Sequence, residues 1–444
     1  MRLIAYMKPY AHWVIFALLL VLGLTAFDLY RPMLVGDAID TFGANGDYDV
    51  IIATAIKYAV VLALSFAFNI AQTWILQKTG QNIILQMRKD LYRHIQSLGS
   101  RYFDITPVGK LVTRVTNDVE ALNEMYSGIL VQLFRNIVKI VGLAGVMLVL
   151  DVRLAAISFV LMPLVIGLTV LCQKIARNIY RLYRTRLTDI NTFLSEHLSG
   201  MKIIQIFGRQ ERKFEEFHDK NTKLYKAFYR EMLMYAVFRP LIYILSILSL
   251  MIVLWFGSKN VFDEIISVGT LYIFSNYIRS FFDPIQELAE QFSTLQSSIA
   301  SAEKIFTVMD EDEFIPEVEN PKQPDKITGK IEFDHVWFAY DGENYVLKDV
   351  SFVINPGEKV AFVGATGAGK SSILNLIGRY YDIQKGHIYI DGIDIRQLSK
   401  KQLRSAIGQM QQDVFIFEGD VAYNIRLNDD NITDAQVKAA AEYV

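Results

Sequence analysis

The sequence predicts a chain of two parts, an all-α domain of six membrane-spanning helices with long polar extensions and then a smaller α/β domain. Three observations predict this division. Of the 444 residues, 52% are hydrophobic and only 21% are charged, which is typical of membrane proteins. The apolar residues gather in long runs before Ala300, and a glycine-rich loop lies between strand-like and helix-like segments near the end of the chain.

Six apolar segments could each cross a bilayer, which takes about 20 mostly apolar residues of helix. Two of them are clear at any hydropathy threshold, and the others are clear only when the six are considered as a set. The sixth continues past its apolar part through Arg279 and Phe281. The segments are Trp13–Val35, Tyr58–Leu76, Ile140–Leu150, Leu154–Gln173, Leu241–Ser258 and Ile265–Ile278.

The charges between these segments predict their orientation. Residues 36–49 hold four aspartates and no Lys or Arg, whereas the segments that follow the second and fourth spans are rich in both. Because positive charge favours the cytoplasmic side, six spans place both termini in the cytoplasm. We therefore expect an integral membrane protein, and its expected location is a bacterial plasma membrane.

In the two basic segments, Asn82–Ser127 and Lys174–Glu231, the apolar residues recur at helical spacing and helix breakers are few. The segments are interpreted either as a helical cytoplasmic subdomain or as continuations of the spans that reach a nucleotide domain. Breaks at Pro107–Gly109 and Ser199–Gly200 would suit a turn with a short contact helix at each tip. We expect the contacts at Phe103–Gly109 and Leu198–Ile204, although such tips could also be simple turns.

The chain after the sixth span predicts a linker and then a sheet. Prolines and acidic residues in 309–330 indicate the linker, so the expected domains are 1–308, 309–330 and 331–444. Strand-like alternation begins at Ile331. Lys359–Val363 is predicted to be a buried strand, and Asp391-Gly392 the turn of a hairpin.

The glycine-rich loop follows that predicted strand directly. Its glycines let consecutive N–H groups point into one concavity, and the helix that follows adds partial positive charge. Lys370 can reach the β- and γ-phosphates, and the Ser371 hydroxyl can bind Mg²⁺. The pattern therefore predicts an α/β P-loop nucleotide-binding domain that takes ATP and Mg²⁺. The candidate binding residues are Gly364, Ala365, Thr366, Gly367, Ala368, Gly369, Lys370, Ser371 and Ser372.

With these residues in view, the tail closely resembles the nucleotide-binding domain of ATP-binding cassette (ABC) transporters. Tyr340 matches the aromatic residue on which that family stacks adenine. The stretch "IGQMQQDVFIFEGDVAYNI" resembles the family's glutamine loop, with Gln412 in the key position. The resemblance implies that Lys370 and Gln412 are catalytic and that Ser371 and Gln412 bind Mg²⁺.

The membrane part resembles the six-helix exporter type of the same superfamily. "RYFDITPVGKLVTRVTNDVEAL" and "FLSEHLSGMKIIQIFGRQE" look like its two cytoplasmic coupling segments, and "SIASAEKIFTVMDEDEF" looks like the exit from its sixth helix. The resemblance implies a half-transporter of the multidrug or lipid type. It would pair with a second half-transporter, identical or different, in the lipid bilayer and export small amphipathic molecules; no nucleic-acid partner is expected.

The chain departs from the family's pattern in one respect. A Leu-Ser-Gly-Gly-Gln-type signature, a second apolar strand ending in Asp-Glu and a switch histidine do not occur in its 444 residues. We therefore expect an incomplete nucleotide domain, in a half-transporter truncated within it. This chain alone is expected to bind nucleotide weakly and to hydrolyse almost none.

Two alternatives remain open at this point. One is a nucleotide-gated channel or regulatory membrane subunit, and the other is a catalytically degenerate partner of an active half-transporter. The substrate is constrained only by two basic residues, Lys139 and Arg279, which fall near mid-membrane. They indicate either a basic cavity that favours anionic or zwitterionic amphiphiles, or pairing with acids such as Asp28 and Asp283.

Overall fold

The computed structural model describes the whole chain except residues 1, 47, 411–414, 428, 430 and 444. It divides into two compact units. The first holds residues 1–97 and 107–311, and the second holds residues 98–106 and 312–444. A short segment from the first third of the chain therefore belongs to the same unit as the C-terminal domain.

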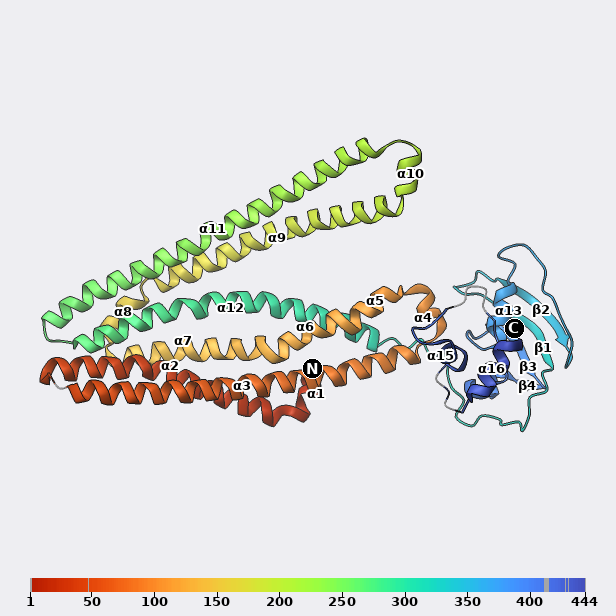
Figure 1. The fold of residues 1–444 in the computed structure, drawn as a ribbon, viewed down its shortest axis with the longest axis horizontal. Coiled ribbons are helices and arrows are strands. Elements are labelled where there is room, and N and C mark those ends of the chain that lie inside the picture. The colour runs from red at the N-terminus through yellow and green to blue at the C-terminus, as the bar shows by residue number, and fades with distance from the viewer. Residues whose placement is uncertain (1, 47, 411–414, 428, 430, 444) are drawn as a thin grey trace. The chain divides into compact units, whose positions relative to one another are not determined.

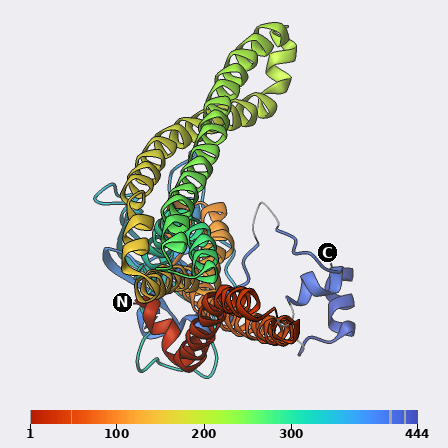
Figure 2. The same cartoon turned by 90° about the vertical axis from the view of Figure 1, so that its left-hand side faces the viewer.

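Long helices build the first unit, and they run side by side in pairs such as α2 with α3 and α9 with α11 (Figures 1 and 2). At 1.5 Å per residue, the 50 residues of α3 extend over about 75 Å, far more than a bilayer core. The helices of this unit are α1 (Arg2–Met7), α2 (Ala11–Asn45), α3 (Tyr48–Ser97), α5 (Val108–Thr113), α6 (Val119–Glu124), α7 (Leu130–Leu150), α8 (Val152–Phe159), α9 (Met162–Ser199), α10 (Met201–Ile206), α11 (Gln210–Phe262) and α12 (Val268–Met309).

Within the described residues, five helical stretches are long and apolar enough to cross a membrane: Arg2–Gly43, Tyr48–Ser97, Val108–Leu150, Val152–Ser199 and Gln210–Phe262. They contain the first five predicted spans. The sixth predicted span lies in α12 from Val268 onwards, and α12 is not among these stretches. Phe274 and Tyr277 of α12 are nevertheless buried in the core formed with α7, α8, α9 and α11. The fold is thus a helical membrane domain with long extensions.

A buried carboxylate joins α12 to the third long helical stretch. Asp118, only 7% exposed, forms an ion pair with Arg114 and accepts a hydrogen bond from Ser301 Oγ at 2.9 Å. Asp118 and Arg114 lie in a single π-helical turn, residues 114–118, between α5 and α6. Because the carboxylate is paired and hydrogen-bonded, its burial is compensated.

Helix α2 crosses the start of α12 at very close range. Asp40 accepts hydrogen bonds from Ser267 Oγ at 2.5 Å and from the Gly269 amide at 2.7 Å. It therefore satisfies an amide of the first helical turn that has no partner within α12. Gly36 and Gly269 are both buried at this crossing. A Cβ on Gly269 would lie 2.1 Å from the Gly36 carbonyl oxygen, so no larger residue fits there.

The second unit contains a four-stranded antiparallel sheet with strand order β2-β1-β3-β4. Phe333 and Ile388 face the core beneath it. As predicted, Asp391 and Gly392 form the β3–β4 turn, both with positive φ, 53° and 77°. The elements are α4 (Ser100–Ile105), β1 (Ile331–Phe338), β2 (Leu347–Ile354), α13 (Lys370–Ile377), β3 (Lys385–Ile390), β4 (Ile393–Asp394), α14 (Lys400–Ser405), α15 (Val421–Arg426) and α16 (Asp434–Tyr443).

The predicted buried strand Lys359–Val363 is wrong for this structure. The segment pairs with no strand of the described chain, and Val363 is 95% exposed. Only Phe362 packs on the sheet, with its ring centroid 5.4 Å from that of Phe352. The physical reason is that a strand of this apolar kind is stable when neighbours pair both its edges and cover both its faces, and the described sheet supplies no such neighbours.

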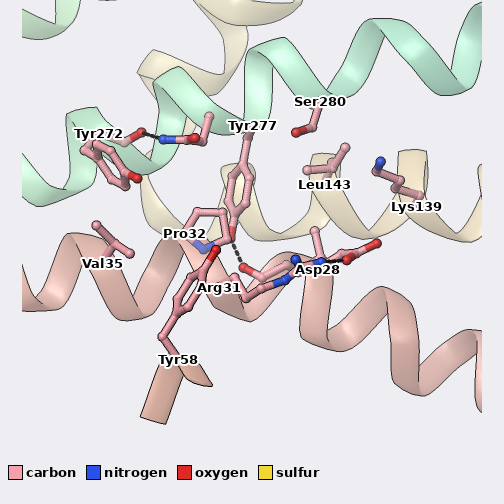
Figure 3. A pocket seen from close by; sticks show the side chains of 12 residues that line it. Asp28, Arg31, Pro32, Val35, Tyr58, Lys139, Leu143, Tyr272, Tyr277 and Ser280 are labelled. Atoms are coloured by element: carbon pink, nitrogen blue, oxygen red, sulfur yellow. Dashed lines mark hydrogen bonds and ion pairs between the residues drawn. The ribbon is translucent and has the colours of Figure 1, made fainter. Parts of the chain in front are cut away.

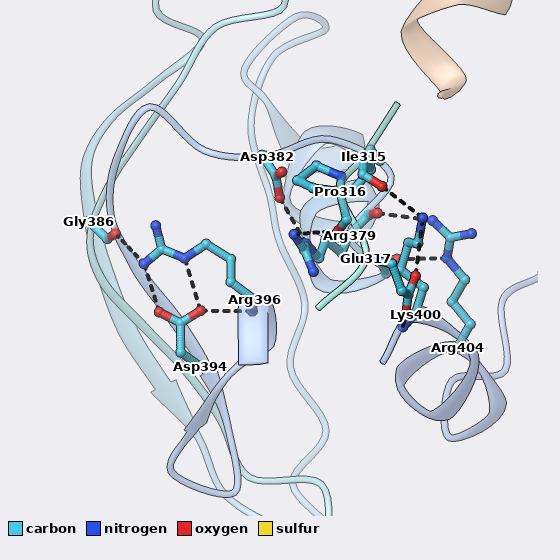
Figure 4. A network of polar contacts seen from close by, with 11 residues as sticks. Ile315, Pro316, Glu317, Arg379, Asp382, Gly386, Asp394, Arg396, Lys400 and Arg404 are labelled. Atoms are coloured by element: carbon cyan, nitrogen blue, oxygen red, sulfur yellow. Dashed lines mark hydrogen bonds and ion pairs between the residues drawn. The ribbon is translucent and has the colours of Figure 1, made fainter. Parts of the chain in front are cut away.

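Within the second unit, two basic residues hold residues 315–317 of the expected linker in place (Figure 4). Arg379, only 3% exposed, donates to the Pro316 carbonyl at 3.2 Å and to Asp382 at 2.9 Å. Lys400 donates to the Ile315 carbonyl at 2.8 Å and pairs with Glu317 at 3.2 Å. The linker is therefore fixed by hydrogen bonds to α14 and to the loop after α13.

A second polar cluster stabilises the short strand β4 (Figure 4). Burial alone would raise the pKa of Asp394, but hydrogen bonds from Arg396 and His387 lower that pKa to about 2. The carboxylate is therefore ionised at neutral pH and anchors the hairpin.

We predict that Gly269→Ala destabilises the first unit by about 1–3 kcal/mol, because the added methyl group must push α2 and α12 apart. The measurement is the thermal unfolding midpoint of the protein in detergent. Gly145→Ala on α7 is the matched control, since its Cβ would meet nothing within 4 Å. Equal midpoints for the two variants would contradict the close crossing.

Candidate functional site

The glycine-rich loop lies between β2 and α13, and its backbone requires glycine at two positions. Gly367 and Gly369 have φ of 87° and 89°, in the left-handed region that side chains disfavour. Gly369 directly precedes α13, and a Cβ there would lie 2.7 Å from Leu347 Cδ2. A Cβ on Gly367 would meet nothing within 4 Å, so the loop is open on that side.

The ammonium group of Lys370 points back into the loop. It donates hydrogen bonds to the carbonyl oxygens of Gly364 at 2.6 Å and Ala365 at 2.9 Å. These contacts hold the ammonium group beside the backbone of the first two residues of the loop. A phosphate would compete for the same ammonium group, because a charge-assisted bond to phosphate is stronger than one to a neutral carbonyl.

The two serines after Lys370 have different surroundings. Ser371 is exposed in the first turn of α13, whereas Ser372 is 4% exposed and its hydroxyl lies 3.0 Å from the Tyr340 hydroxyl. Tyr340 is partly buried and packs edge-on against Tyr381, with ring centroids 5.0 Å apart. The structure thus places Tyr340 beside α13, at one end of the loop.

These residues fit a magnesium–nucleotide group. The loop combines an open glycine backbone, a lysine ammonium group, a helix N-terminus and an exposed serine hydroxyl, which are the donors that bind phosphate and Mg²⁺. Gln412, the other residue expected to take part, lies outside the described residues.

Helix α4 follows the long helix α3 in the chain, but it belongs to the second unit. The Gly99 amide, just before α4, donates to the Glu313 carbonyl at 2.8 Å. Arg101 pairs with Glu313 at 3.2 Å and with Asp341 at 3.6 Å. The first expected contact segment, Phe103–Gly109, therefore overlaps a helix that packs within the nucleotide-binding unit.

A tyrosine on the nucleotide-binding unit completes this contact. The Tyr381 hydroxyl donates a hydrogen bond to Asp104 of α4. Burial, together with the hydrogen bond and charge of Asp104, raises the pKa of Tyr381 above its usual range, so the hydroxyl stays protonated and remains a donor. Sequence analysis missed this pair, because its members are 277 positions apart and no local pattern links them.

The second expected contact segment, Leu198–Ile204, forms the end of α9 and most of α10. Helix α10 has no buried residues within the first unit, and Ile203 is 63% exposed. The break at Ser199–Gly200 is confirmed, since α9 ends at Ser199 and α10 begins at Met201. Its role as a contact stays a prediction.

Two family profiles match this chain. The profile described as "ABC transporter transmembrane region" matches residues 14–285, and the profile described as "ABC transporter" matches residues 347–444. The first covers most of the helical unit, and the second covers β2, the glycine-rich loop and everything after them.

Relatives with this organisation align over nearly the whole chain. One is exp8 of Streptococcus pneumoniae, an ABC transporter ATP-binding protein by name, which is 35% identical over 444 residues, 100% of this chain and 76% of the relative. The fatty acid ABC transporter ATP-binding/permease protein of Mycobacterium bovis is 35% identical over 86% of this chain and 60% of its own length. The ATP-dependent lipid A-core flippase of Desulfotalea psychrophila is 29% identical over 96% of this chain and 74% of its own length.

Helices long enough to span a membrane, a phosphate-binding loop before α13 and matches along both parts lead to one assignment. The chain belongs to the ABC transporter family, with a transmembrane region and an ATP-binding region in one polypeptide.

Proposed function

We propose that this chain is one half of a dimeric exporter that uses ATP to move small hydrophobic or amphipathic molecules, of the drug or lipid type, across a membrane. The observation that carries the proposal is the place of α4. This helix continues the chain from membrane helix α3, yet it belongs to the compact unit that holds the glycine-rich loop. The names of two relatives, a fatty acid transporter and a lipid A-core flippase, support an amphipathic substrate.

In this proposal each residue of the site would bind a different part of the nucleotide or its metal ion. The backbone amides of 364–369 and the Lys370 ammonium group would bind phosphates, and Tyr340 would stack on adenine. Ser371, with Gln412, would hold Mg²⁺, which supplies neutralising charge to the phosphates when bound. Lys370 would exchange its contacts with Gly364 and Ala365 for phosphate oxygens.

The proposal also includes the placement of the chain. The domains would be residues 1–308 in and below the membrane, the linker 309–330, and the nucleotide-binding part 331–444. Both termini would lie in the cytoplasm of a bacterium, because the basic segments cluster on one side of the predicted spans. Nucleotide binding would stabilise one of two global states of the dimer, and α4 would transmit that preference to α3.

We predict that Lys370→Ala weakens ATP binding by roughly 10- to 100-fold, because it removes a charge-assisted contact worth about 1.5–3 kcal/mol. Binding is measured by fluorescence titration of the purified protein. Export is measured in inside-out vesicles from cells that express the native gene, and it should stop. Lys359→Ala is the matched control, since Lys359 is an exposed lysine just before the loop.

Unchanged binding and export in Lys370→Ala would overturn the proposal. Flux that continues with a non-hydrolysable nucleotide would indicate a nucleotide-gated channel instead. Export that stops only when a second, different half-transporter is mutated would indicate a degenerate partner.

We also predict that Tyr381→Phe uncouples transport from nucleotide binding. The variant keeps the ring that packs on Phe338 and Tyr340 but loses the hydrogen bond to Asp104. ATP affinity should stay within about twofold, while export slows by about tenfold, as expected for one hydrogen bond to a charged group. Tyr389→Phe on β3 is the matched control, because its ring stacks on His387 at a site away from α4. Equal export by both variants would contradict a coupling role for Asp104 and Tyr381.

A further inference from the structure

A cavity of 330 Å³ opens inside the first unit, between α2, α3, α7 and α12 (Figure 3). Its size lies at the lower end of the range for small-molecule sites. Its walls combine apolar side chains with polar ones. The polar residues that line it include Asp28, Arg31, Lys139, Asn276 and Ser280, together with the tyrosines Tyr58, Tyr272 and Tyr277.

Three cations lie around the carboxylate of Asp28 at this cavity. Asp28 forms an ion pair with Arg31, and its other oxygen lies 3.5 Å from the Arg135 guanidinium. One carboxylate is therefore shared by two guanidinium groups. Lys139 adds another cation, so the cluster of Asp28, Arg31, Arg135 and Lys139 (the basic cluster) holds three cations and one carboxylate. Asp283 and Glu287 of α12 also act on the charge of Lys139, but neither forms an ion pair with it in the described chain.

Two donors of the basic cluster lack a protein acceptor. The Nε of Arg31 is buried without a hydrogen-bond partner. Lys139 is half-buried, and no carboxylate of the described chain lies within ion-pair distance of it. The nearby Glu287 instead accepts from Asn136 at 3.0 Å. The half-buried Lys139 ammonium group therefore has no acceptor in the described chain, and the headgroup of a ligand in the cavity would supply one.

The other expected basic residue, Arg279, does not belong to this site. Its side chain is exposed, and it is not among the residues that line the cavity. Ser280, the next residue on α12, does line it. The sequence placed both Lys139 and Arg279 near mid-membrane, but neighbouring positions on a helix point about 100° apart. Only the three-dimensional packing determines which of them faces the cavity.

The depth of the basic cluster makes its charge significant. Lys139 precedes the end of α7 at Leu150 by about 16 Å of helix rise, so it lies well inside the hydrocarbon region. Asp28 and Arg31 occupy the middle of α2, far from either end of that helix. Charges at this depth are rare and usually face a substrate pathway or a partner.

We propose that the basic cluster binds the anionic headgroup, phosphate or carboxylate, of the amphiphile that the protein exports. This inference rests on the proposed export function and names the substrate class. Lys139 and the guanidinium group of Arg31 would donate to the headgroup oxygens, and Leu29, Val35 and Leu143 of the cavity wall would contact the start of the acyl chain.

Binding is tested in the full protein reconstituted in phosphatidylcholine nanodiscs without nucleotide. The probes are fluorescent lysophosphatidic acid, which is anionic, and an alkylammonium amphiphile with the same chain. Lys139→Met should weaken binding of the anionic probe about tenfold and leave the cationic probe unchanged, while Lys139→Arg keeps both. Lys259→Met, an exposed lysine near the end of α11, is the control.

Asp28→Asn gives a test that misfolding cannot mimic. Removing the carboxylate of Asp28 makes the basic cluster more positive, so the anionic probe should bind more tightly. Tighter binding in Asp28→Asn together with weaker binding in Lys139→Met supports the inference. Equal affinity of the wild type and both variants for the anionic probe would overturn it.

Transport separates an exported amphiphile from a resident anionic lipid. In proteoliposomes, Lys139→Met should slow ATP-dependent export of lysophosphatidic acid relative to the cationic probe. Weaker binding with unchanged export would mean that the cluster holds a resident lipid, which overturns the substrate assignment. Loss of all export in Lys370→Ala, with the preference between probes unchanged in Lys139→Met, would leave the proposed function intact and remove only this inference.

Discussion

Helix α4 is held by the nucleotide-binding unit, although the chain on both sides of it belongs to the membrane unit. The bond from the Gly99 amide to Glu313, the ion pairs of Arg101 and the hydrogen bond from Tyr381 to Asp104 fasten it there. Helix α3, an unbroken helix of 50 residues, ends just before α4. A long helix transmits displacement along its axis because its backbone hydrogen bonds resist bending. The proposed coupling between nucleotide binding and the membrane helices depends on this contact.

The membrane unit contains charged side chains in two different arrangements. At Asp118 and Asp40, the carboxylates are satisfied by the protein itself, and both bind α12 to other helices. At the basic cluster, the carboxylate is outnumbered and donors of Arg31 and Lys139 lack protein acceptors. The first arrangement stabilises the fold, whereas the second is understandable as a site for something that is not part of the chain.

The sequence alone predicted the features that depend on local pattern. Long apolar runs, the glycine-rich loop and the Asp391-Gly392 turn each follow from neighbouring residues, and the structure contains all three. It did not predict features that depend on distant partners. Lys359–Val363 has the composition of a buried strand but pairs with no described strand. Tyr381 bonds to Asp104, which lies 277 positions earlier in the chain. The difference between Lys139 and Arg279 likewise depends on packing, since both have the same depth and charge.

The proposed export requires that the cavity open to opposite sides of the membrane in the two global states that nucleotide binding selects between. The most direct measurement places a cysteine at Ser280, which lines the cavity, in a Cys172→Ser background that removes the only natural thiol. A membrane-impermeant thiol reagent is then applied from each side of proteoliposomes, with ATP and without it. The account predicts that labelling from the nucleotide-domain side falls and labelling from the opposite side rises when ATP binds. Labelling that is the same on each side with and without ATP would contradict it.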